Sequence, residues 1–425
     1  AYATANGTAT AGSDYTARSG TLSFAAGVAT VNIAVPIIND TVVDLVAGHV
    51  TWTIEGLTVL KPFIRREPPS FVRAILRVAT AELLSEGAAA HGVVHEAVEI
   101  TRRAGRNTEG FTGLVNAVLR KVSATDPQAF LAAPPQPLPG WLRGRLMSAW
   151  GKPATMAMEA AQARGAATDL TPRNGDAAAL ATLVGGQGLP TGSVRLANAT
   201  QISDLPGFEQ GDWWVQDAAA AIAARALRPQ TGERILDLCA APGGKTLQLA
   251  AAGATVTSLD LSASRMERVA ENLARCKLSA QTVVADALTW QPDAPFDAVL
   301  LDAPCSATGT IRRHPELPRI RDGAGLAALT DLQARLIDHG LGILKPGGRL
   351  VYATCSLLPA EGEDQLAAAL ARHPGLTVEP PAAPGIDPAW ITPQGALRLR
   401  PDLWPERGGM DGFFIMRLRK SPEGT

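Results

Sequence analysis

Apolar and polar residues follow three different periods along the chain, and each period predicts a different kind of element. In residues 22–35, apolar positions recur at every second residue on both sides of an Ala-Ala-Gly turn, which is typical of a β-hairpin. From about residue 50 to 147 they recur at i, i+3, i+4 and i+7, as in PSFVRAILRVATAELLSEG. This spacing predicts short amphipathic helices packed as a bundle.

From residue 216 onward, apolar runs alternate with helical patterns. Strands are expected in ERILDL, ATVTSLD, AQTVVAD, FDAVLLD and GGRLVYAT, and a long helix near 326–344. This order is typical of a doubly wound parallel sheet, in which ligands bind at the carboxyl ends of the strands. A Pro-rich linker at 131–141 and a mixed pattern after it predict a small α+β subdomain. We therefore expect four parts, at 1–45, 50–147, 148–215 and 216–421.

The composition narrows the class of protein. With 425 residues, 46% hydrophobic content and a net charge of −1, the chain can bury a core but is not a polycation, so nucleic-acid binding would need a local basic surface. Four cysteines without a CxxC pair favour a reducing compartment and no disulfide framework. No apolar run reaches the roughly 18 residues of a membrane span. We expect a cytoplasmic monomer that does not enter a membrane.

Metal sites are disfavoured by the residue patterns. His91 and His95 lie four positions apart on one predicted helix, but the motif is not HExxH and no third ligand is near, so a place on the helix surface is favoured. Asp14, Asp40 and Asp44 are too dispersed to suggest a calcium site. We expect no metal.

The turn DLCAAPGGKT has the character of a ligand-binding loop. Gly243 and Gly244 allow the backbone to approach a ligand closely, and the helix that follows offers unpaired N–H groups. The turn matches neither the P-loop nor GxGxxG, which disfavours a nucleoside triphosphate or NAD. Asp260 ends the next strand, where a carboxylate can accept both ribose hydroxyls, and Asp286 ends the third, beside an adenine. Together with Asp302, these acids favour an adenosine-bearing ligand.

Several long motifs in a constant order resemble a known family. CAAPGGKT, LDAPCSATGTIRRHPE, YATCSLLPAEGEDQ and GGMDGFFIMRLRK are together similar to the RsmB (Sun) RNA 5-methylcytosine methyltransferases. FVRAILRVATAELL, AHGVVHEAVEI and GFTGLVNAVLRKV resemble the NusB-like RNA-binding domain, and residues 1–45 resemble part of a Calx-beta domain. The resemblance implies an α/β Rossmann-like methyltransferase domain that uses S-adenosyl-L-methionine, preceded by an all-α NusB-like domain and a short N-terminal β segment.

The resemblance also implies a set of cofactor contacts. They are Cys239, Ala240, Ala241, Pro242, Gly243, Gly244, Lys245, Asp260, Asp286 and Asp302.

The implied chemistry accounts for two cysteines at strand ends. C5 of cytosine is a poor nucleophile, but addition of a thiolate to C6 leaves electron density at C5, which can then attack a methyl donor. Asp302 is expected to serve as the acid near N3. By the resemblance, Cys355 is the nucleophile and Cys305 assists product release. Spacing alone leaves the opposite assignment open, as in DNA cytosine methyltransferases, whose nucleophile lies in a Pro-Cys motif.

A basic cluster directly after Cys305 suggests contacts to RNA. The segment TGTIRRHPELPRIR is expected to hold phosphates beside the target base, through Arg312, Arg313, His314, Arg319 and Arg321. Trp213 and Trp214 are compatible either with stacking on RNA or with packing at a domain junction.

The leading functional hypothesis is an RNA cytosine-C5 methyltransferase that acts on 16S ribosomal RNA. One alternative keeps this chemistry but changes the substrate to transfer RNA or another RNA. The other is a non-catalytic RNA-binding assembly factor, and the presence of Cys305, Cys355 and Asp302 argues against it.

Overall fold

The computed structural model describes residues 59–84, 88–128, 135–197 and 201–422, together with the backbone of two short antiparallel strands, β1 (Tyr2–Ala3) and β2 (Ser19–Gly20). The hairpin predicted at 22–35 lies outside the described residues. Within the described ranges, no helix has the length and apolar character needed to cross a membrane.

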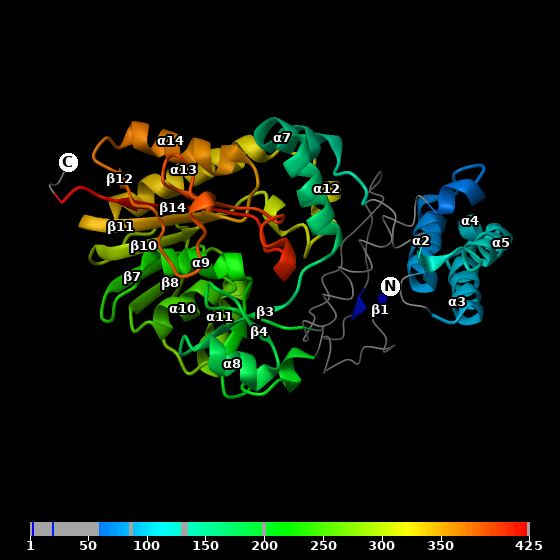
Figure 1. The fold of residues 1–425 in the computed structure, drawn as a ribbon, viewed down its shortest axis with the longest axis horizontal. Coiled ribbons are helices and arrows are strands. Elements are labelled where there is room, and N and C mark those ends of the chain that lie inside the picture. The colour runs from blue at the N-terminus through cyan, green and yellow to red at the C-terminus, as the bar shows by residue number, and fades with distance from the viewer. Residues whose placement is uncertain are drawn as a thin grey trace.

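The described residues between 59 and 128 are mainly helical, as their period predicts, and Figure 1 shows them as a separate group of helices. Its apolar faces meet in one core that contains Leu76, Val94 and Leu119. His91 and His95 are both exposed, as expected of side chains on a helix surface. The helices are α2 (Ser70–Leu84), α3 (Ala90–Arg103), α4 (Arg106–Glu109) and α5 (Thr112–Val122).

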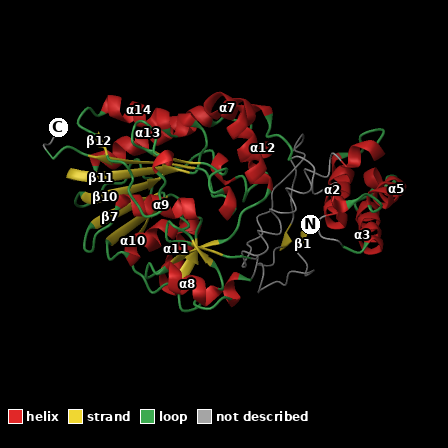
Figure 2. Ribbon diagram, viewed as in Figure 1, coloured by secondary structure: helices red, strands yellow, loops and turns green. Residues whose placement is uncertain are grey.

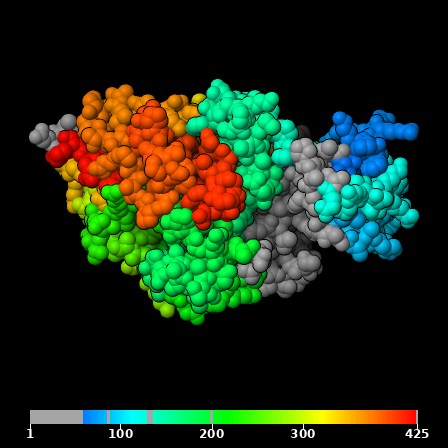
Figure 3. Space-filling view, viewed as in Figure 1, coloured from blue at the N-terminus to red at the C-terminus, as the bar shows by residue number. Residues whose placement is uncertain are grey.

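A helix and a small antiparallel sheet follow. The helix α7 (Gly140–Ala163) is kinked at Gly151, whose φ of 79° is not helical, two residues before Pro153. In the space-filling view α7, in teal, lies flush against the C-terminal residues, in orange and red (Figure 3). The sheet order is β4-β5-β3-β6. Its elements are β3 (Asp169–Pro172), α8 (Ala177–Val184), β4 (Gln187–Gly188), β5 (Val194–Arg195) and β6 (Trp213–Val215).

The largest part of the fold is an eight-stranded sheet with the order β12-β14-β11-β10-β7-β8-β9, and β13 pairs with β14. Neighbours from β9 to β11 are parallel. The five predicted strands, β7 to β11, are thus parallel as expected. Strands β12 and β14 were not predicted from the sequence, and β14 is antiparallel to both β11 and β12. The strands are β7 (Arg234–Leu238), β8 (Thr255–Asp260), β9 (Gln281–Val284), β10 (Phe296–Asp302), β11 (Leu344–Thr354), β12 (Thr377–Val378), β13 (Leu397–Leu399) and β14 (Phe413–Arg419).

Helices cover both faces of this sheet (Figure 2). Because side chains alternate along a strand, Leu301 and Tyr352 pack toward α13 and α14, whereas Leu300 and Val351 pack toward α9. The helices are α9 (Ala218–Leu227), α10 (Gly244–Ala251), α11 (Ala263–Arg275), α12 (Leu317–Ile320), α13 (Leu326–Gly342) and α14 (Glu363–Arg372).

The direction of strand order reverses between β7 and β10. The chain runs outward from β7 to β8 and β9, and then returns to β10 on the other side of β7. Such a reversal is where open α/β sheets bind ligands, at the carboxyl ends of the strands. The Gly-rich turn follows β7, and Cys305 follows β10, so both lie at this reversal.

Candidate active site

The carboxyl ends of β10 and β11 bring two thiols together. Cys305 follows β10 and Cys355 follows β11, and these strands are parallel neighbours. Ala303 N–H donates to Ala353 O at 2.9 Å, and Gly309 N–H donates to Cys355 O at 2.9 Å, so the two loops run side by side. The Sγ atoms of Cys305 and Cys355 lie 3.5 Å apart.

A lysine from the Gly-rich turn reaches the same place. Lys245 Nζ donates to Asp302 Oδ2 at 2.6 Å, which is a charge-assisted hydrogen bond. Burial opposes the charged form of Lys245, but the Asp302 carboxylate outweighs it, and the pKa of the Lys245 ammonium is raised. The sequence had suggested Lys245 only as a cofactor contact, whereas the structure joins it to Asp302.

The environment of Cys355 favours its protonated form. The hydrogen bond with Cys305, burial, and the nearby charges of Cys305 and Asp302 raise the pKa of the Cys355 thiol well above its ordinary value. The charge of Lys245 acts in the opposite direction. Since a thiolate is the nucleophilic form, Cys355 needs a proton acceptor before it can attack.

The turn between β7 and α10 has an unusual backbone. Cys239 has a φ of 60° and Gly243 a φ of 104°, and the peptide bond between Ala241 and Pro242 is cis. Burial, followed by the charges of Asp260, Asp302 and Asp237, raises the pKa of the Cys239 thiol to about 12. A thiol so surrounded by carboxylates is a poor nucleophile, which agrees with a role for Cys239 through its backbone.

Two of the predicted acids support backbone turns. Asp260 is 4% exposed, and its Oδ2 accepts from Ala241 N at 3.2 Å while its Oδ1 accepts from Ser262 N at 3.0 Å. Asp286 is exposed, and its Oδ1 accepts from Leu288 N at 2.9 Å. Asp260 is the last residue of β8, and Asp286 lies two residues beyond the end of β9, so both are at the edge of the sheet that holds the thiols.

Asp237, inside β7, opens the DLCAAPGGKT motif that the sequence indicated as ligand-binding, but the sequence did not assign it a role of its own. It is fully buried, and its Oδ2 accepts from Thr246 Oγ1 at 2.6 Å, while its Oδ1 has no hydrogen-bond partner in the described structure. Burial raises its pKa to about 7, against the opposing effects of Thr246 and Lys245. Its two signals in the sequence were its place in an apolar strand and its position at the start of the Gly-rich motif.

Glu361 is a second residue that the sequence did not single out. It ends the 3-10 turn η4 (Pro359–Glu361), is fully buried, and bonds to Ser306 and Ser356, the residues directly after the two cysteines. Nothing in PAEGED distinguishes Glu361 from Glu363 and Asp364, because the difference lies in which of them faces the interior.

Arg312 is not available to RNA, and the prediction that it contacts phosphate is wrong. Its side chain is 1% exposed and donates to Asp411 Oδ1 at 2.7 Å and Asp217 Oδ2 at 2.8 Å. Arg313 bonds to the same two carboxylates and its side chain is 23% exposed. The basic run therefore serves mainly to neutralise two buried acids. His314, in contrast, has a side chain that is 48% exposed.

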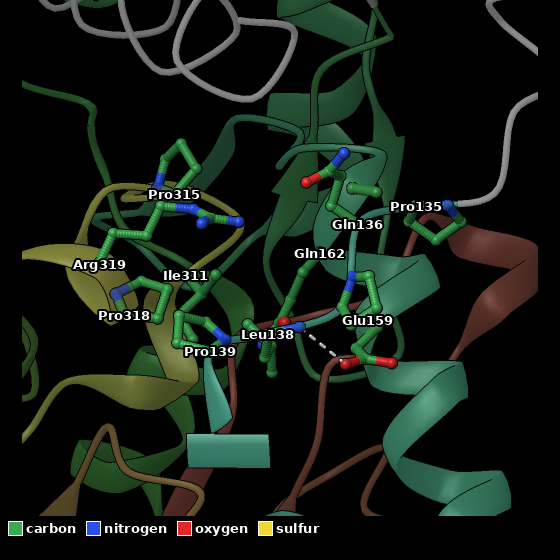
Figure 4. Close-up of a pocket in the computed structure, with 12 residues that line it drawn as sticks. Pro135, Gln136, Leu138, Pro139, Glu159, Gln162, Ile311, Pro315, Pro318 and Arg319 are labelled. Atoms are coloured by element: carbon green, nitrogen blue, oxygen red, sulfur yellow. Dashed lines mark hydrogen bonds between the residues drawn. The ribbon is translucent and has the colours of Figure 1, made fainter. Parts of the chain in front are cut away.

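Other cations of the same segment remain at the surface. Arg319 and Arg321 are exposed, and Arg321 Nη1 donates to Ser306 O at 3.2 Å, close to Cys305. Arg319 lines a hollow of about 60 Å³ between the 135–139 segment, α7 and the loop after Cys305 (Figure 4). Gln162, in the same hollow, is 5% exposed and has no partner for either amide atom in the described structure. The hollow thus combines apolar walls with unsatisfied polar groups.

The two neighbouring tryptophans are packing residues. Trp213 and Trp214 are 0% and 3% exposed, and their Nε1 atoms donate to Pro206 O and Gln216 Oε1. Stacking of these rings on RNA is therefore excluded in this conformation, and the alternative of packing at a junction is the correct one.

Comparison with protein families and curated proteins shows which known proteins this chain is similar to. Residues 224–419 match the family "16S rRNA methyltransferase RsmB/F", residues 33–124 match the NusB family, and residues 1–55 match the Calx-beta domain. A ribosomal RNA small subunit methyltransferase B from Sodalis glossinidius is 34% identical over 89% of this chain and 87% of its own length. The enzyme of that name from Pseudomonas putida is also 34% identical, over 89% of both chains.

Solved structures share the fold. A methyltransferase homolog protein from Pyrococcus horikoshii is 28% identical with a TM-score of 0.57, over 65% of this chain and 93% of its own. NSun6 from the same organism, solved with the S-adenosylmethionine analogue SFG, is 20% identical with a TM-score of 0.58, over 67% of this chain and 98% of its own. With the long matches to curated relatives, these findings show that the chain belongs to the RsmB/F family of S-adenosylmethionine-dependent 16S rRNA methyltransferases.

Proposed function

We propose that this protein methylates C5 of a cytosine in 16S ribosomal RNA through a covalent adduct between Cys355 and C6 of the base. The observation that carries the proposal is the pair of thiols 3.5 Å apart, beside the Lys245–Asp302 ion pair. Relatives named ribosomal RNA small subunit methyltransferase B support the choice of RNA.

The first step is the activation of Cys355. Its raised pKa means that the thiol must give up a proton, and the Asp302 carboxylate is one of the charges that act on it. We propose that Asp302 accepts this proton and that the Asp302–Lys245 pair delivers it to N3 of the cytosine. The sulfur lone pair then forms the bond to C6, and the electrons of the C5–C6 double bond become available at C5.

The second step is product release. S-adenosylmethionine, when bound, supplies an electrophilic methyl group to C5. The proton on C5 must then leave, so that its bonding electrons re-form the C5–C6 double bond and expel the Cys355 sulfur. We propose that Cys305, after it has given up its own proton to solvent, accepts this proton, because its Sγ lies 3.5 Å from the departing sulfur. The proton on N3 returns through Asp302 to the expelled Cys355 sulfur. The two thiols thus have different roles at one base.

The acidic residues at the carboxyl ends of β7, β8 and β9 fit an adenosine-bearing cofactor. The buried, unpaired Oδ1 of Asp237 and the carboxylates of Asp260 and Asp286 lie at or near the ends of three adjacent strands. We propose that Asp260 accepts from the ribose hydroxyls and Asp286 from the adenine. The turn from Cys239 to Lys245 would hold the amino acid portion through its backbone.

For RNA binding, the exposed cations near Cys305 are the better candidates. We propose His314, Arg319 and Arg321 as phosphate contacts, because all three are exposed on the segment that follows Cys305. The target base must leave any stack to reach the thiols.

Methyl transfer to defined RNA tests the proposal directly. Unmodified 16S RNA and transfer RNA would each be incubated with S-adenosylmethionine carrying a labelled methyl group, and bisulfite sequencing would locate the product. Labelling of one cytosine in 16S RNA, lost in Cys355→Ala, is expected. Labelling of transfer RNA alone would show that transfer RNA, and not 16S RNA, is the substrate. Cofactor binding without any methyl transfer to RNA would overturn the assignment as an enzyme.

A further inference from the structure

We propose that Glu361 is a positioning residue that sets the distance and direction between the two active-site thiols. The expected effect on catalysis rests on the proposed function. The expected effect on the distance between Cys305 and Cys355 does not. Glu361 acts through the residues that flank these cysteines.

The side chain of Glu361 joins the two cysteine loops. Its Oε1 accepts from Ser306 N at 2.8 Å, and its Oε2 accepts from Ser306 Oγ at 2.5 Å and from Ser356 Oγ at 2.6 Å. Ser306 directly follows Cys305, and Ser356 directly follows Cys355. One carboxylate therefore bonds to both loops at the positions next to the sulfurs.

The side before Cys305 is held as well. Gln333 Nε2, on α13, donates to Glu361 Oε1 at 3.0 Å and to Pro304 O at 2.8 Å. Ser306 is thus bonded to Glu361 directly, and Pro304 is linked to it through Gln333. With both flanking residues held, the backbone position of Cys305 is fixed, and this sets the point from which its sulfur projects.

The backbone of Glu361 fixes it to the end of β11. Its carbonyl oxygen accepts from Tyr352 Oη at 2.8 Å and from Thr354 Oγ1 at 3.0 Å. Glu361 is 0% exposed, so water does not compete for these bonds. The strand that carries Cys355 therefore also anchors the group that holds the loop of Cys305.

This arrangement predicts how substitutions will behave. In Glu361→Ala, four hydrogen bonds next to the two sulfurs are lost, although backbone bonds such as Gly309 N–H to Cys355 O still join the loops. We expect the sulfurs to shift relative to one another, and a misplacement of about 1 Å can cost on the order of 100-fold in rate. In Glu361→Gln, the remaining carbonyl can still accept from Ser306 N and Gln333, while the serine hydroxyls rotate to accept from the new amide. We expect Glu361→Gln to retain a rate within about tenfold of the wild type.

The test measures thiol placement and catalysis separately. In the RNA-free protein, a diazene oxidant would take two electrons and two protons from Cys305 and Cys355, which form a disulfide while the diazene becomes a hydrazine. The disulfide formation rate would be compared with kcat and KM for RNA methylation. Asp364→Ala, an exposed acid on the first turn of α14, is the matched control.

We expect Glu361→Ala to lower both the disulfide rate, by at least about tenfold, and kcat, by about 100-fold, with KM for RNA little changed. Glu361→Gln should largely restore both rates, and Asp364→Ala should match the wild type. Wild-type values of both rates in folded Glu361→Ala would overturn the proposal.

If Glu361→Ala fails to fold, the double variant Ser306→Ala/Ser356→Ala removes only the hydroxyl donors and should lower the same two rates. Unchanged rates in that variant would count against the proposal equally. A wild-type protein whose thiols join readily but which never methylates RNA would refute the proposed function and leave the positioning role intact.

Discussion

The Sγ atoms of Cys305 and Cys355 lie 3.5 Å apart, although 50 positions separate the two residues in the chain. The closeness arises because β10 and β11 are parallel neighbours and each cysteine lies just beyond the carboxyl end of its strand. Two thiols at this distance can act on the same base, one to attack and the other to assist release.

This relationship predicts opposite outcomes for two substitutions. Cys305→Ala should accumulate a covalent complex with 16S RNA that resists denaturation, because attack proceeds and release does not. Cys355→Ala should form no such complex. Gel electrophoresis of denatured protein–RNA mixtures measures both, and a trapped complex in Cys355→Ala instead would reverse the assignment of nucleophile and release group.

The pH dependence of Cys355 alkylation should show how Cys305 and Lys245 shift the pKa of the Cys355 thiol. The hydrogen bond with Cys305 is the largest cause of the raised pKa of Cys355, so Cys305→Ala should lower that pKa and move the alkylation midpoint to lower pH. Lys245→Met removes a charge that lowers the pKa and should move the midpoint upward. Iodoacetamide rates followed by peptide mass spectrometry give both midpoints, and equal midpoints in all three proteins would contradict the account.

Arg312 should matter for stability. Its removal leaves the buried carboxylates of Asp217 and Asp411 with less compensation, and breaking a buried pair costs about 3–5 kcal/mol. We expect Arg312→Ala to lower the free energy of unfolding by an amount of this order in urea denaturation. Arg335→Ala, in an exposed pair with Asp331, should change it by no more than about 0.5 kcal/mol. Equal effects of the two substitutions would be inconsistent with a buried network.

Arg319, unlike Arg312, should matter for RNA binding and not for stability. It is exposed and lines the hollow beside the loop after Cys305 (Figure 4), so Arg319→Ala should leave unfolding unchanged but weaken RNA binding. Loss of one phosphate contact should also reduce the slope of log affinity against log salt by about 1. Filter binding at several salt concentrations, with Arg335→Ala as control, provides the measurement. An unchanged slope would remove Arg319 from the phosphate contacts.

Asp237 should make stability depend on pH. Its pKa is about 7 in the folded protein, above the value of about 3.9 for an unfolded chain. The folded state therefore holds the proton through the range from about pH 4 to 7, and stability should fall as the pH rises through that range. Asp237→Asn is neutral at every pH and should flatten this slope. Urea unfolding at pH 5 and pH 8 tests the difference, and an equal slope in both proteins would show that another group is responsible.

The local pattern of the chain was sufficient to predict the five parallel strands β7 to β11 and the edge of the sheet at which the two cysteines lie. Strand β10 is an apolar run that ends in Asp302, and β11 is an apolar run that ends just before Cys355. Both could be predicted because the formation and the ends of a strand depend on residues that are neighbours in the sequence. Parallel strands align their carboxyl ends, so Asp302, Cys305 and Cys355 could be expected at one edge before the fold was known. The helices of residues 70–122 were predictable for the same reason.

The antiparallel β14 and the partners of buried charges depend on contacts between distant parts of the chain. Arg312 lies 95 positions from Asp217 and 99 from Asp411, so its sequence neighbours suggest a basic surface although its actual environment is a buried ion network. Glu361 is one acid among three in PAEGED, and only the approach of the Ser306 loop, 55 positions earlier, makes it a link between two thiols. Periodicity reports which face of an element is buried, but the pairing of polar groups in the interior is a property of the whole packed chain.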